Sequence, residues 1–340
     1  MTYRMSVCIP VYNCGAYLGE ALESILPQAG DGVEVVIYDG GSTDNTSEVV
    51  KPYLAATPQL QYHRGPARGG IDADMAKCVA LACGEYCWLF SGDDVMRPGA
   101  LRRALQAVQS RRDVYVCQHT LCDIGMNVSR DYPVLTPNRA FAAELSDASA
   151  RREWFRRAAN TEAFFSFMSG LVVRRAKWLD GRLIPEFDGS CWAHVARLFE
   201  LIDRGLSVSY VPEIWLDQRG DNDSFREKGI VDRIRLAIEG FNRIGDRFFS
   251  RDSVEAFHIR RVLRNEFSLK GFCYLKLLTA DSAFRSQREL LDKMVKEAYS
   301  DRSVETFAKE ATYRLAPPWA IRMAIKLWRL LRGRPINLSR

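Results

Sequence analysis

The chain has 340 residues, of which 47% are hydrophobic and 26% charged, values typical of a soluble globular protein larger than one average domain. No stretch approaches 18 uninterrupted apolar residues, so the sequence predicts no membrane-spanning helix. The net charge is +6, and the segment 319–340 alone carries six arginines and lysines with no acidic residue. We therefore expect that the binding partner attracted by this positive charge contacts the C-terminal segment.

The chain has nine cysteines, an odd number, and no CxxC pair. Several lie in apolar runs, as Cys87 does between Tyr86 and Trp88. This usage favours reduced core cysteines in a cytosolic protein and argues against a zinc site.

The first 120 residues alternate strand and helix patterns. Strand-like runs occupy 5–11, 33–38, 59–64, 86–90 and 114–118, and helical spacing occupies 17–25, 42–53 and 71–83, with Ser42 or Thr43 as the expected cap of the second helix. Such alternation predicts an α/β fold with a mostly parallel, Rossmann-like sheet covered by helices on both faces.

The later part of the chain has a different pattern. Residues 164–174 are predicted as a strand pair and residues 192–202 as a helix, and from about residue 225 the pattern is helical throughout. We therefore divide the chain into a domain of residues 1–224, a helical C-terminal region of residues 225–316 and a basic amphipathic tail of residues 317–340.

Polar clusters follow the predicted strands, at residues 10–14, 39–46, 64–72 and 91–94. Ligands of parallel α/β sheets bind beyond the carboxyl ends of the strands, so these clusters are expected to form one site. The site residues expected from them are Pro10, Tyr12, Asn13, Asp39, Gly41, Arg64, Gly70, Asp72 and Asp93.

The segment Ser91-Gly92-Asp93-Asp94 places two adjacent carboxylates at the end of a buried strand. Such a pair is costly unless it is solvated or bound to a cation, and Mg²⁺ or Mn²⁺ would accept these oxygens together with waters and phosphate oxygens. An ordinary turn is the alternative for these four residues. The buried strand and the other clusters favour a metal site formed by Asp93 and Asp94.

The run from Asp39 to Thr46 suits an anionic ligand. Its glycines let the backbone approach a ligand closely, and the N-terminus of the following helix favours anions. Asp39 would accept hydrogen bonds from a nucleobase or ribose. The alternative is an ordinary strand-to-helix turn.

Four motifs occur in the order and spacing of family 2 glycosyltransferases, which the chain resembles over about residues 5–220. They are Cys8-Ile9-Pro10-Val11-Tyr12-Asn13, the run Asp39–Thr46, Ala82-Cys83-Gly84-Glu85-Tyr86 and Ser91-Gly92-Asp93-Asp94. The runs Gly69-Gly70-Ile71-Asp72-Ala73-Asp74 and Cys87–Asp94 further resemble bacterial abequosyltransferases, which transfer a 3,6-dideoxyhexose during O-antigen assembly.

The resemblance implies the GT-A fold and transfer of a sugar from a nucleoside-diphosphate donor to a saccharide acceptor. Pro10, Tyr12 and Asp39 would line the nucleoside pocket, and Asp93 or Asp94 would bind Mn²⁺ or Mg²⁺. The metal would neutralise charge on the departing diphosphate. Arg219 falls in a segment that closes over the donor in such enzymes and would pair with phosphate oxygens, with an exposed surface arginine as the alternative.

The chain departs from the family pattern in three places. Ser91 stands where many members have Asp, and Asp74-Met75-Ala76 stands where many have Ala-Arg-Asn. The Glu-Asp pair that often carries the general base is replaced by the segment 188–194, in which Asp188 and His194 are the candidates. We take Asp188 as the base, because the family uses a carboxylate; a turn at Asp188 and a structural His194 are the alternatives.

Other functional classes agree less well with these residues. The missing Glu-Asp pair leaves open a nucleotide-binding protein of the same fold with weak or no catalysis. The absence of GxGxxG after the first strand argues against a dinucleotide-dependent oxidoreductase. No nucleic-acid partner is expected, because the core has no basic patch interleaved with aromatic residues.

The segment 318–332 predicts an amphipathic helix with a basic side and an apolar side. The basic side holds Arg322, Lys326, Arg329 and Arg332, and the other side holds Ile321, Ala324, Leu327, Trp328 and Leu331. This pattern favours a helix lying on an anionic membrane surface, with docking on its own protein or on a second copy in a homodimer as the alternatives. The start of the chain has too short an apolar run for a signal peptide. We therefore expect a cytoplasmic protein, peripheral on the inner face of the cytoplasmic membrane, where a lipid-linked acceptor would be reached.

Overall fold

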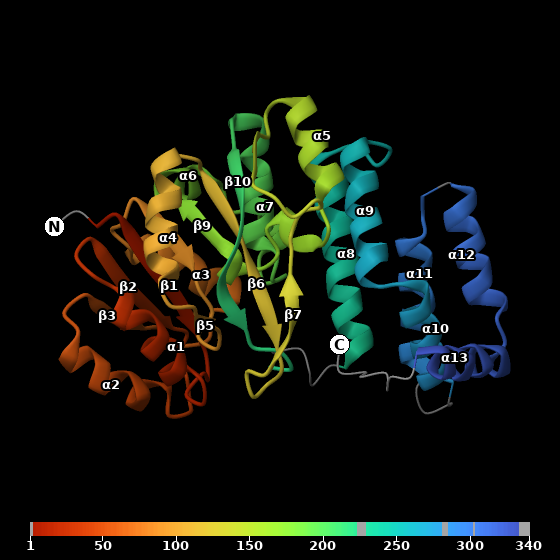
Figure 1. The fold of residues 1–340 in the computed structure, drawn as a ribbon, viewed down its shortest axis with the longest axis horizontal. Helices are drawn as coiled ribbons and strands as arrows, with labels where there is room; N and C mark the ends of the chain where they lie inside the picture. Colours follow the sequence, from red (N-terminus) through yellow and green to blue (C-terminus); the bar gives the residue numbers. More distant parts are fainter. Residues whose placement is uncertain (1–2, 223–228, 281–284, 302, 333–340) are drawn as a thin grey trace. The chain divides into compact units, whose positions relative to one another are not determined.

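The computed structural model describes residues 3–222, 229–280, 285–301 and 303–332 (Figure 1). The chain forms two compact units, Met1–Gly220 and Asp221–Arg340. The boundary expected between residues 224 and 225 lies outside the described residues, and residues 316 and 317 lie between two helices of the second unit.

A ten-stranded sheet forms the centre of the first unit in the described part of the chain. Its order is β3-β2-β1-β4-β9-β6-β10-β5, with β7 paired to β6 and β8 paired to β10. The strands are β1 (Met5–Val11), β2 (Val33–Asp39), β3 (Leu60–Arg64), β4 (Tyr86–Leu89), β5 (Val95–Met96), β6 (Val114–Cys122), β7 (Val128–Tyr132), β8 (Phe141–Glu144), β9 (Leu171–Arg174) and β10 (Ser207–Gln218).

The strands β3, β2, β1 and β4 are parallel, as the alternating pattern predicts. Val11 lies opposite Asp39, and Asp39 lies opposite Arg64, so the carboxyl ends of these strands meet at one edge. The other half of the sheet is mixed, because β9 runs antiparallel to both of its neighbours, β4 and β6. The expected strand pair at 164–174 contributes only β9, since the residues before it form short 3-10 turns.

The strands β1 and β2 are buried along their whole length, which explains their near-continuous apolar sequences. Two carboxylates of β2, Glu34 and Asp39, are exceptions, and Glu34 is fully buried and accepts hydrogen bonds from Ser6 Oγ at 2.6 Å and the Cys83 N–H at 2.5 Å. A Cβ on Gly84 would lie 2.7 Å from the backbone nitrogen of Ser6. The close approach of these two segments therefore requires glycine at position 84.

Helices pack against this sheet, and one of them begins later than the sequence predicts. They are α1 (Leu18–Ile25), α2 (Thr46–Ala56), α3 (Ile71–Leu81), α4 (Ala100–Ala107), α5 (Ala148–Arg157), α6 (Arg175–Asp180) and α7 (Ala193–Glu200). The expected cap of α2 at Ser42 or Thr43 is wrong, since α2 begins at Thr46. Ser42 Oγ instead accepts the N–H of Asn13 at 2.9 Å.

The second unit is helical, as expected for the region after residue 225. It comprises α8 (Ile230–Phe248), α9 (Val254–Glu266), α10 (Leu269–Leu278), α11 (Arg285–Ala298), α12 (Val304–Leu315) and α13 (Pro318–Arg332). Its core includes Ile238, Phe272, Leu291, Met294 and Tyr313.

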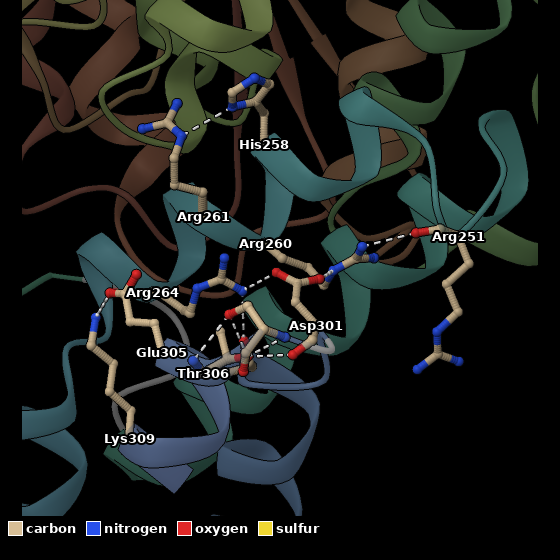
Figure 2. Close-up of polar contacts among 11 residues, drawn as sticks. Arg251, His258, Arg260, Arg261, Arg264, Asp301, Glu305, Thr306 and Lys309 are labelled. Carbon is tan, nitrogen blue, oxygen red and sulfur yellow. Dashed lines mark hydrogen bonds and ion pairs between the residues drawn. The ribbon is translucent and has the colours of Figure 1, made fainter.

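A buried carboxylate joins two helices of this unit (Figure 2). Asp301, with a side chain 8% exposed, pairs with Arg260 and, at 2.5 Å, with Arg264, both from α9. Ser303 and Thr306 form a capping box that starts α12 just after this carboxylate. The ion pairs therefore hold the start of α12 against α9.

No helix in the described part of the chain is long and apolar enough to cross a membrane. Each of the nine cysteines is free, and five of them are buried in or beside the sheet. The buried ones are Cys8, Cys78, Cys87, Cys117 and Cys122.

Candidate functional site

The loops that follow β1 and β2 are locked together by side chains. The N–H of Thr43 donates to Asn13 Oδ1 at 2.8 Å, and the N–H of Gly15 donates to Asp44 Oδ2 at 3.0 Å. Asn13 adopts a left-handed backbone with φ of +51°, a conformation that Asn tolerates better than most residues. These contacts give the edge of the sheet a fixed, polar rim.

Gly41 lets a third loop approach this rim. Its φ is +84°, and a Cβ at this position would lie 3.1 Å from Ala67 Cα. Both facts favour glycine, as the sequence motif indicated. The loop after β3, which carries Ala67 and Arg68, is thereby brought against the loop after β2.

Asp39 has internal partners in this structure. It is fully buried, its Oδ1 accepts the N–H of Ser42 at 2.7 Å, and its Oδ2 accepts the hydroxyl of Tyr62. Burial and this hydrogen bond raise the pKa of Tyr62. Arg64 lies beside Asp39, because its Nε is 4.0 Å from Asp39 Oδ2. Its Nη2 donates to Ser42 O at 2.5 Å. The expected contact of Asp39 with a ligand stays a prediction, and the structure assigns its carboxylate to holding the loop.

Arg68 lies beside the expected site, although the sequence motifs did not point to it. Its guanidinium lies 4.4 Å from the centroid of the Tyr12 ring, in cation–π geometry, and its side chain is exposed. Tyr12 itself was expected at the site, as was Pro10, which is buried in β1. An arginine within the run Arg64–Gly70 was the available signal, but only the fold shows that it reaches Tyr12.

Asp74 lies between Gly40 and Gly69, which belong to the loops after β2 and β3. A Cβ on Gly40 would lie 2.3 Å from Asp74 Oδ2, and a Cβ on Gly69 would lie 2.7 Å from Oδ1. The side chain is 3% exposed, and Oδ1 has no hydrogen-bond partner among the described residues. Burial raises the pKa of Asp74, and the charges of Lys77 and Arg68 oppose that shift. A buried oxygen without a hydrogen-bond partner is costly, so Asp74 Oδ1 suits an O–H or N–H group of a ligand.

The two carboxylates that follow β4 face different surroundings. Asp93 is half-buried and accepts the hydroxyl of Ser91. Asp94 is 2% exposed, and its Oδ1 accepts the N–H of Arg219 at 3.0 Å. Burial and the charge of Asp93 raise the pKa of Asp94 to about 8. Asp94 is therefore held in the interior, and of the pair Asp93 is the more accessible.

A divalent cation fits this turn with few protein ligands. Mg²⁺ is commonly bound by one or two carboxylates, with waters and substrate phosphates completing its shell. Asp93 supplies such a carboxylate, whereas the described residues contain no group of three His, Cys, Asp or Glu that would enclose a metal by themselves. A Cβ on Gly92 would lie 2.8 Å from Val11 Cγ1, so glycine there lets the turn pack on β1.

Arg219, expected to bind phosphate or else to be exposed, is buried with internal partners. It is 7% exposed, its Nε donates to Asp93 O at 2.9 Å, and its Nη1 donates to Ile124 O at 2.7 Å. Nη2 pairs with Glu20 of α1. The alternative of a surface arginine is wrong. The guanidinium instead fixes the turn that carries Asp93.

The two candidate bases lie in opposite environments. Asp188 is exposed, in the loop before α7. His194 is 7% exposed, and its Nε2 lies 3.0 Å from Phe165 O. Burial lowers the pKa of His194 to about 4, so the ring is neutral at pH 7 and donates to this carbonyl. The structural alternative therefore accounts for His194, and Asp188 is the accessible candidate.

Asp72, expected among the ligand contacts, points its carboxylate at the loop beside Asp188. Its Oδ2 accepts the N–H of Cys191 at 2.9 Å, and its Oδ1 accepts the N–H of Ala193 at 3.2 Å. Gly70, the residue before α3, has φ of +86° and provides the turn into that helix. The clusters at the strand ends thus meet as expected, but Asp72 serves the N-terminus of α7.

Solved structures with a similar fold are glycosyltransferases. TarS from S. aureus in complex with UDP-GlcNAc superposes with a TM-score of 0.60 at 16% identity, covering 98% of this chain and 93% of that chain. The mannosyltransferase PcManGT from Pyrobaculum calidifontis, in complex with GDP-Man and Mn²⁺, gives a TM-score of 0.52 at 16% identity and covers 98% and 89% of the two chains. The fold is therefore GT-A with a helical C-terminal region.

Sequence comparisons agree with this class. Residues 6–164 match the family model described as glycosyl transferase family 2. Abequosyltransferase RfbV from Salmonella typhimurium is 27% identical over 260 residues, which are 73% of this chain and 76% of that protein. Glycosyltransferase GlyG from Streptococcus pneumoniae is 30% identical over 111 residues, 33% of this chain and 37% of that protein. The chain is therefore similar to family 2 glycosyltransferases over residues 6–164 and to an abequosyltransferase over a longer stretch.

Proposed function

We propose that the chain transfers a sugar from a nucleoside-diphosphate donor to a saccharide acceptor, with a divalent cation bound by Asp93. The observation that carries this proposal is the meeting of four polar loops at one sheet edge, the last of which carries Asp93. Solved relatives of the fold include complexes with UDP-GlcNAc and with GDP-Man and Mn²⁺, which supports a nucleotide-sugar donor and a metal.

Several side chains have the chemistry that such a donor requires. The Tyr12 ring offers an aromatic face, and the guanidinium of Arg68 above it offers positive charge for the diphosphate. The unpartnered Oδ1 of Asp74 suits a hydroxyl of the ribose or sugar. A metal held by Asp93 would stabilise the charge of the departing diphosphate as a Lewis acid.

Asp188 is proposed as the general base that takes the proton of the acceptor hydroxyl. It is an exposed carboxylate, and an inverting transfer needs such a group within hydrogen-bond reach of the acceptor. Replacing Asp188 with Asn removes the proton acceptor at constant size. Turnover close to that of the unmodified protein would rule out this role.

The likeness to RfbV extends the proposal to the sugar and the acceptor. It supports a 3,6-dideoxyhexose as the transferred sugar and a lipid-linked saccharide as the acceptor, in the synthesis of a bacterial surface polysaccharide or O-antigen. Comparing turnover of CDP-, UDP- and dTDP-linked sugars would identify the donor.

Binding of nucleoside diphosphates tests the proposal against its alternative. The melting temperature should rise with one of CDP, UDP or dTDP, and rise further with Mn²⁺ present, since a ligand of the folded state stabilises it. The matching nucleotide sugar should then be hydrolysed slowly without an acceptor. Binding without any hydrolysis or transfer would favour a catalytically inactive nucleotide-binding protein.

We further propose that α13 lies on an anionic membrane surface. Three apolar side chains of α13 spaced four residues apart, Trp319, Met323 and Leu327, are 60% to 66% exposed, and Leu315 at the end of α12 is 80% exposed. Arg322 and Lys326 beside them are exposed as well, and the segment has no acidic residue. An apolar stripe flanked by basic residues suits the boundary between lipid headgroups and acyl chains.

The apolar side expected from the sequence needs one correction. Ile321 is 6% exposed and α13 contacts α10 of the same unit, whereas the side chains of Trp328 and Leu331 lie outside the described residues. The helix is thus partly docked on its own protein, and the stripe 315–327 is the face left for lipid. A membrane location on the cytoplasmic side would bring the enzyme to a lipid-linked acceptor.

Vesicle flotation tests this proposal. Binding to vesicles with anionic lipid should be lost when Trp319, Met323 and Leu327 are all changed to Ser. The matched control changes Val304 and Phe307 of α12, which are 88% and 73% exposed, and should bind as before. Equal flotation of both variants would contradict the proposal, and a dimer that dissociates in the first variant would favour a second copy as the occupant.

A further inference from the structure

The first turn of α3 carries two buried carboxylates, and each of them contacts a different part of the chain. Asp74 lies against Gly40 and Gly69, on the side of the proposed donor. Asp72, two residues earlier and 6% exposed, accepts N–H groups of Cys191 and Ala193. One helical turn therefore contacts both the donor-side loops and the loop that leads into α7.

The loop 188–192 needs such an anchor. Gly189 and Cys191 both have φ of +70°, and for Cys this left-handed conformation is unfavourable unless surrounding contacts hold it. Trp192, the N-cap residue of α7, makes no side-chain capping hydrogen bond. The first N–H groups of a helix need acceptors, and here one acceptor comes from α3, 119 and 121 residues away in sequence.

Asp72 is kept buried at a cost. Burial raises the pKa of its carboxyl, and the N–H groups of Cys191 and Ala193 act in the opposite direction. The charge of Asp188 adds to the upward shift of the pKa of Asp72. Asp72 is thus a buried carboxylate that accepts two backbone N–H groups from the segment following the exposed Asp188. Such an arrangement can hold the neighbouring carboxylate, Asp188, in place.

We propose that Asp72 is a positioning residue for glycosyl transfer, which caps α7 from α3 and thereby fixes the loop of Asp188 relative to the donor-side turn 69–74. The inference rests on the proposed function, because Asp188 is the proposed base. Asp72 acts through the backbone of Cys191 and Ala193 and does not itself touch substrate.

The variant Asp72→Asn tests this role at constant side-chain size. An Asn oxygen accepts one of the two N–H groups, but its amide group faces the other N–H with no lone pair to offer. The matched control is Asp147→Asn, since Asp147 caps α5 in the same unit by accepting the Ala150 N–H at 2.7 Å. Asp147 is exposed and belongs to neither loop of the proposed site.

Two readouts separate positioning from general stability. Amide hydrogen exchange at residues 191 and 193 should accelerate by about tenfold in Asp72→Asn, as expected for the loss of a buried hydrogen bond. The ratio of sugar transfer to donor hydrolysis should also fall by about tenfold, because hydrolysis does not use the acceptor base. This ratio is independent of the fraction of folded enzyme, and Asp147→Asn should leave it unchanged.

Either of two results would overturn the role of Asp72. An unchanged ratio alongside faster exchange would make Asp72 a stabilising cap only. Unchanged exchange would show that the loop does not depend on Asp72. A folded, unmodified protein that neither hydrolyses nor transfers any nucleotide sugar would instead reject the proposed function itself, and with it any catalytic meaning of the loop's position.

Discussion

The backbone N–H of Arg219 donates to Asp94 Oδ1 at 3.0 Å, and the guanidinium of the same residue donates to the carbonyl of Asp93. One residue at the end of β10 thus holds both members of the acidic pair. The turn that presents Asp93 is therefore held in place by a residue whose side chain is largely buried.

Arg219→Ala is expected to lower the free energy of unfolding by about 2 kcal/mol, because its largely buried guanidinium loses hydrogen bonds to Asp93, Ile124 and Glu20. Urea titration of the purified protein measures this. Arg4→Ala removes an exposed pair with Glu85 and should cost less than about 1 kcal/mol. Unchanged stability of Arg219→Ala with weaker nucleotide binding would restore the phosphate-binding role expected from sequence.

Arg68→Ala is expected to weaken binding of the matching nucleoside diphosphate by roughly fivefold, since both a positive charge and the stacking on Tyr12 are lost. Isothermal titration calorimetry measures the affinity. The control is Arg130→Ala, which removes a similar contact 5.1 Å from the Tyr132 ring, within β7. Equal affinities in both variants would show that Arg68 lies outside the donor site.

The lowered pKa of His194 predicts that the free energy of unfolding depends on pH. Its pKa is about 4 in the folded protein and near 6.5 when unfolded, so between these values the unfolded chain binds the proton and the folded chain does not. Stability should therefore decrease as the pH falls from 7 to 5, by an amount on the order of 2 kcal/mol from this residue. His194→Gln keeps a donor for Phe165 O and does not titrate, so its urea midpoint should fall less over this range. Identical decreases would refute the assignment.

Asp301→Ala should destabilise the second unit by about 3 kcal/mol, because Arg260 and Arg264 lose their common carboxylate in a largely buried position (Figure 2). Thermal unfolding followed by circular dichroism would show this as an earlier transition of the helical unit. Lys309→Ala removes the exposed pair with Glu305 in the neighbouring α12 and should shift the transition little. Similar shifts in the two variants would contradict the prediction.

The parallel half of the fold could be predicted because its signals are local. Each of β1, β2 and β4 is an apolar run that ends in a polar cluster, and parallel pairing then brings the clusters to one edge. The insertion of β9 between β4 and β6 could not be predicted, because strand pairing across about 80 residues leaves no local pattern. The short apolar sequence of β9 also cannot be distinguished by its pattern from other buried segments.

The same distinction applies to the site. Asn13, Gly41 and Asp93 could be placed at the edge of the sheet from sequence, because turn chemistry and strand position specify where they lie; their contact with a ligand stays a prediction. Asp72 and Arg219 were assigned to ligand, since polar residues in a motif are read as contacts, whereas the fold gives their groups to backbone partners far away in the chain. Burial of a charged residue is a property of the fold, which a single sequence does not display.

The central claim is tested most directly by turnover of nucleotide sugars in the unmodified protein and in Asp93→Asn, each with and without Mn²⁺ or Mg²⁺. We expect the unmodified protein to release the nucleoside diphosphate from at least one donor when a metal is present. We expect this rate to fall by about a hundredfold in Asp93→Asn, because the metal loses its carboxylate ligand. A folded protein that binds nucleoside diphosphate but consumes no donor, or an Asp93→Asn variant as active as the unmodified protein, would contradict the proposed metal-dependent transfer.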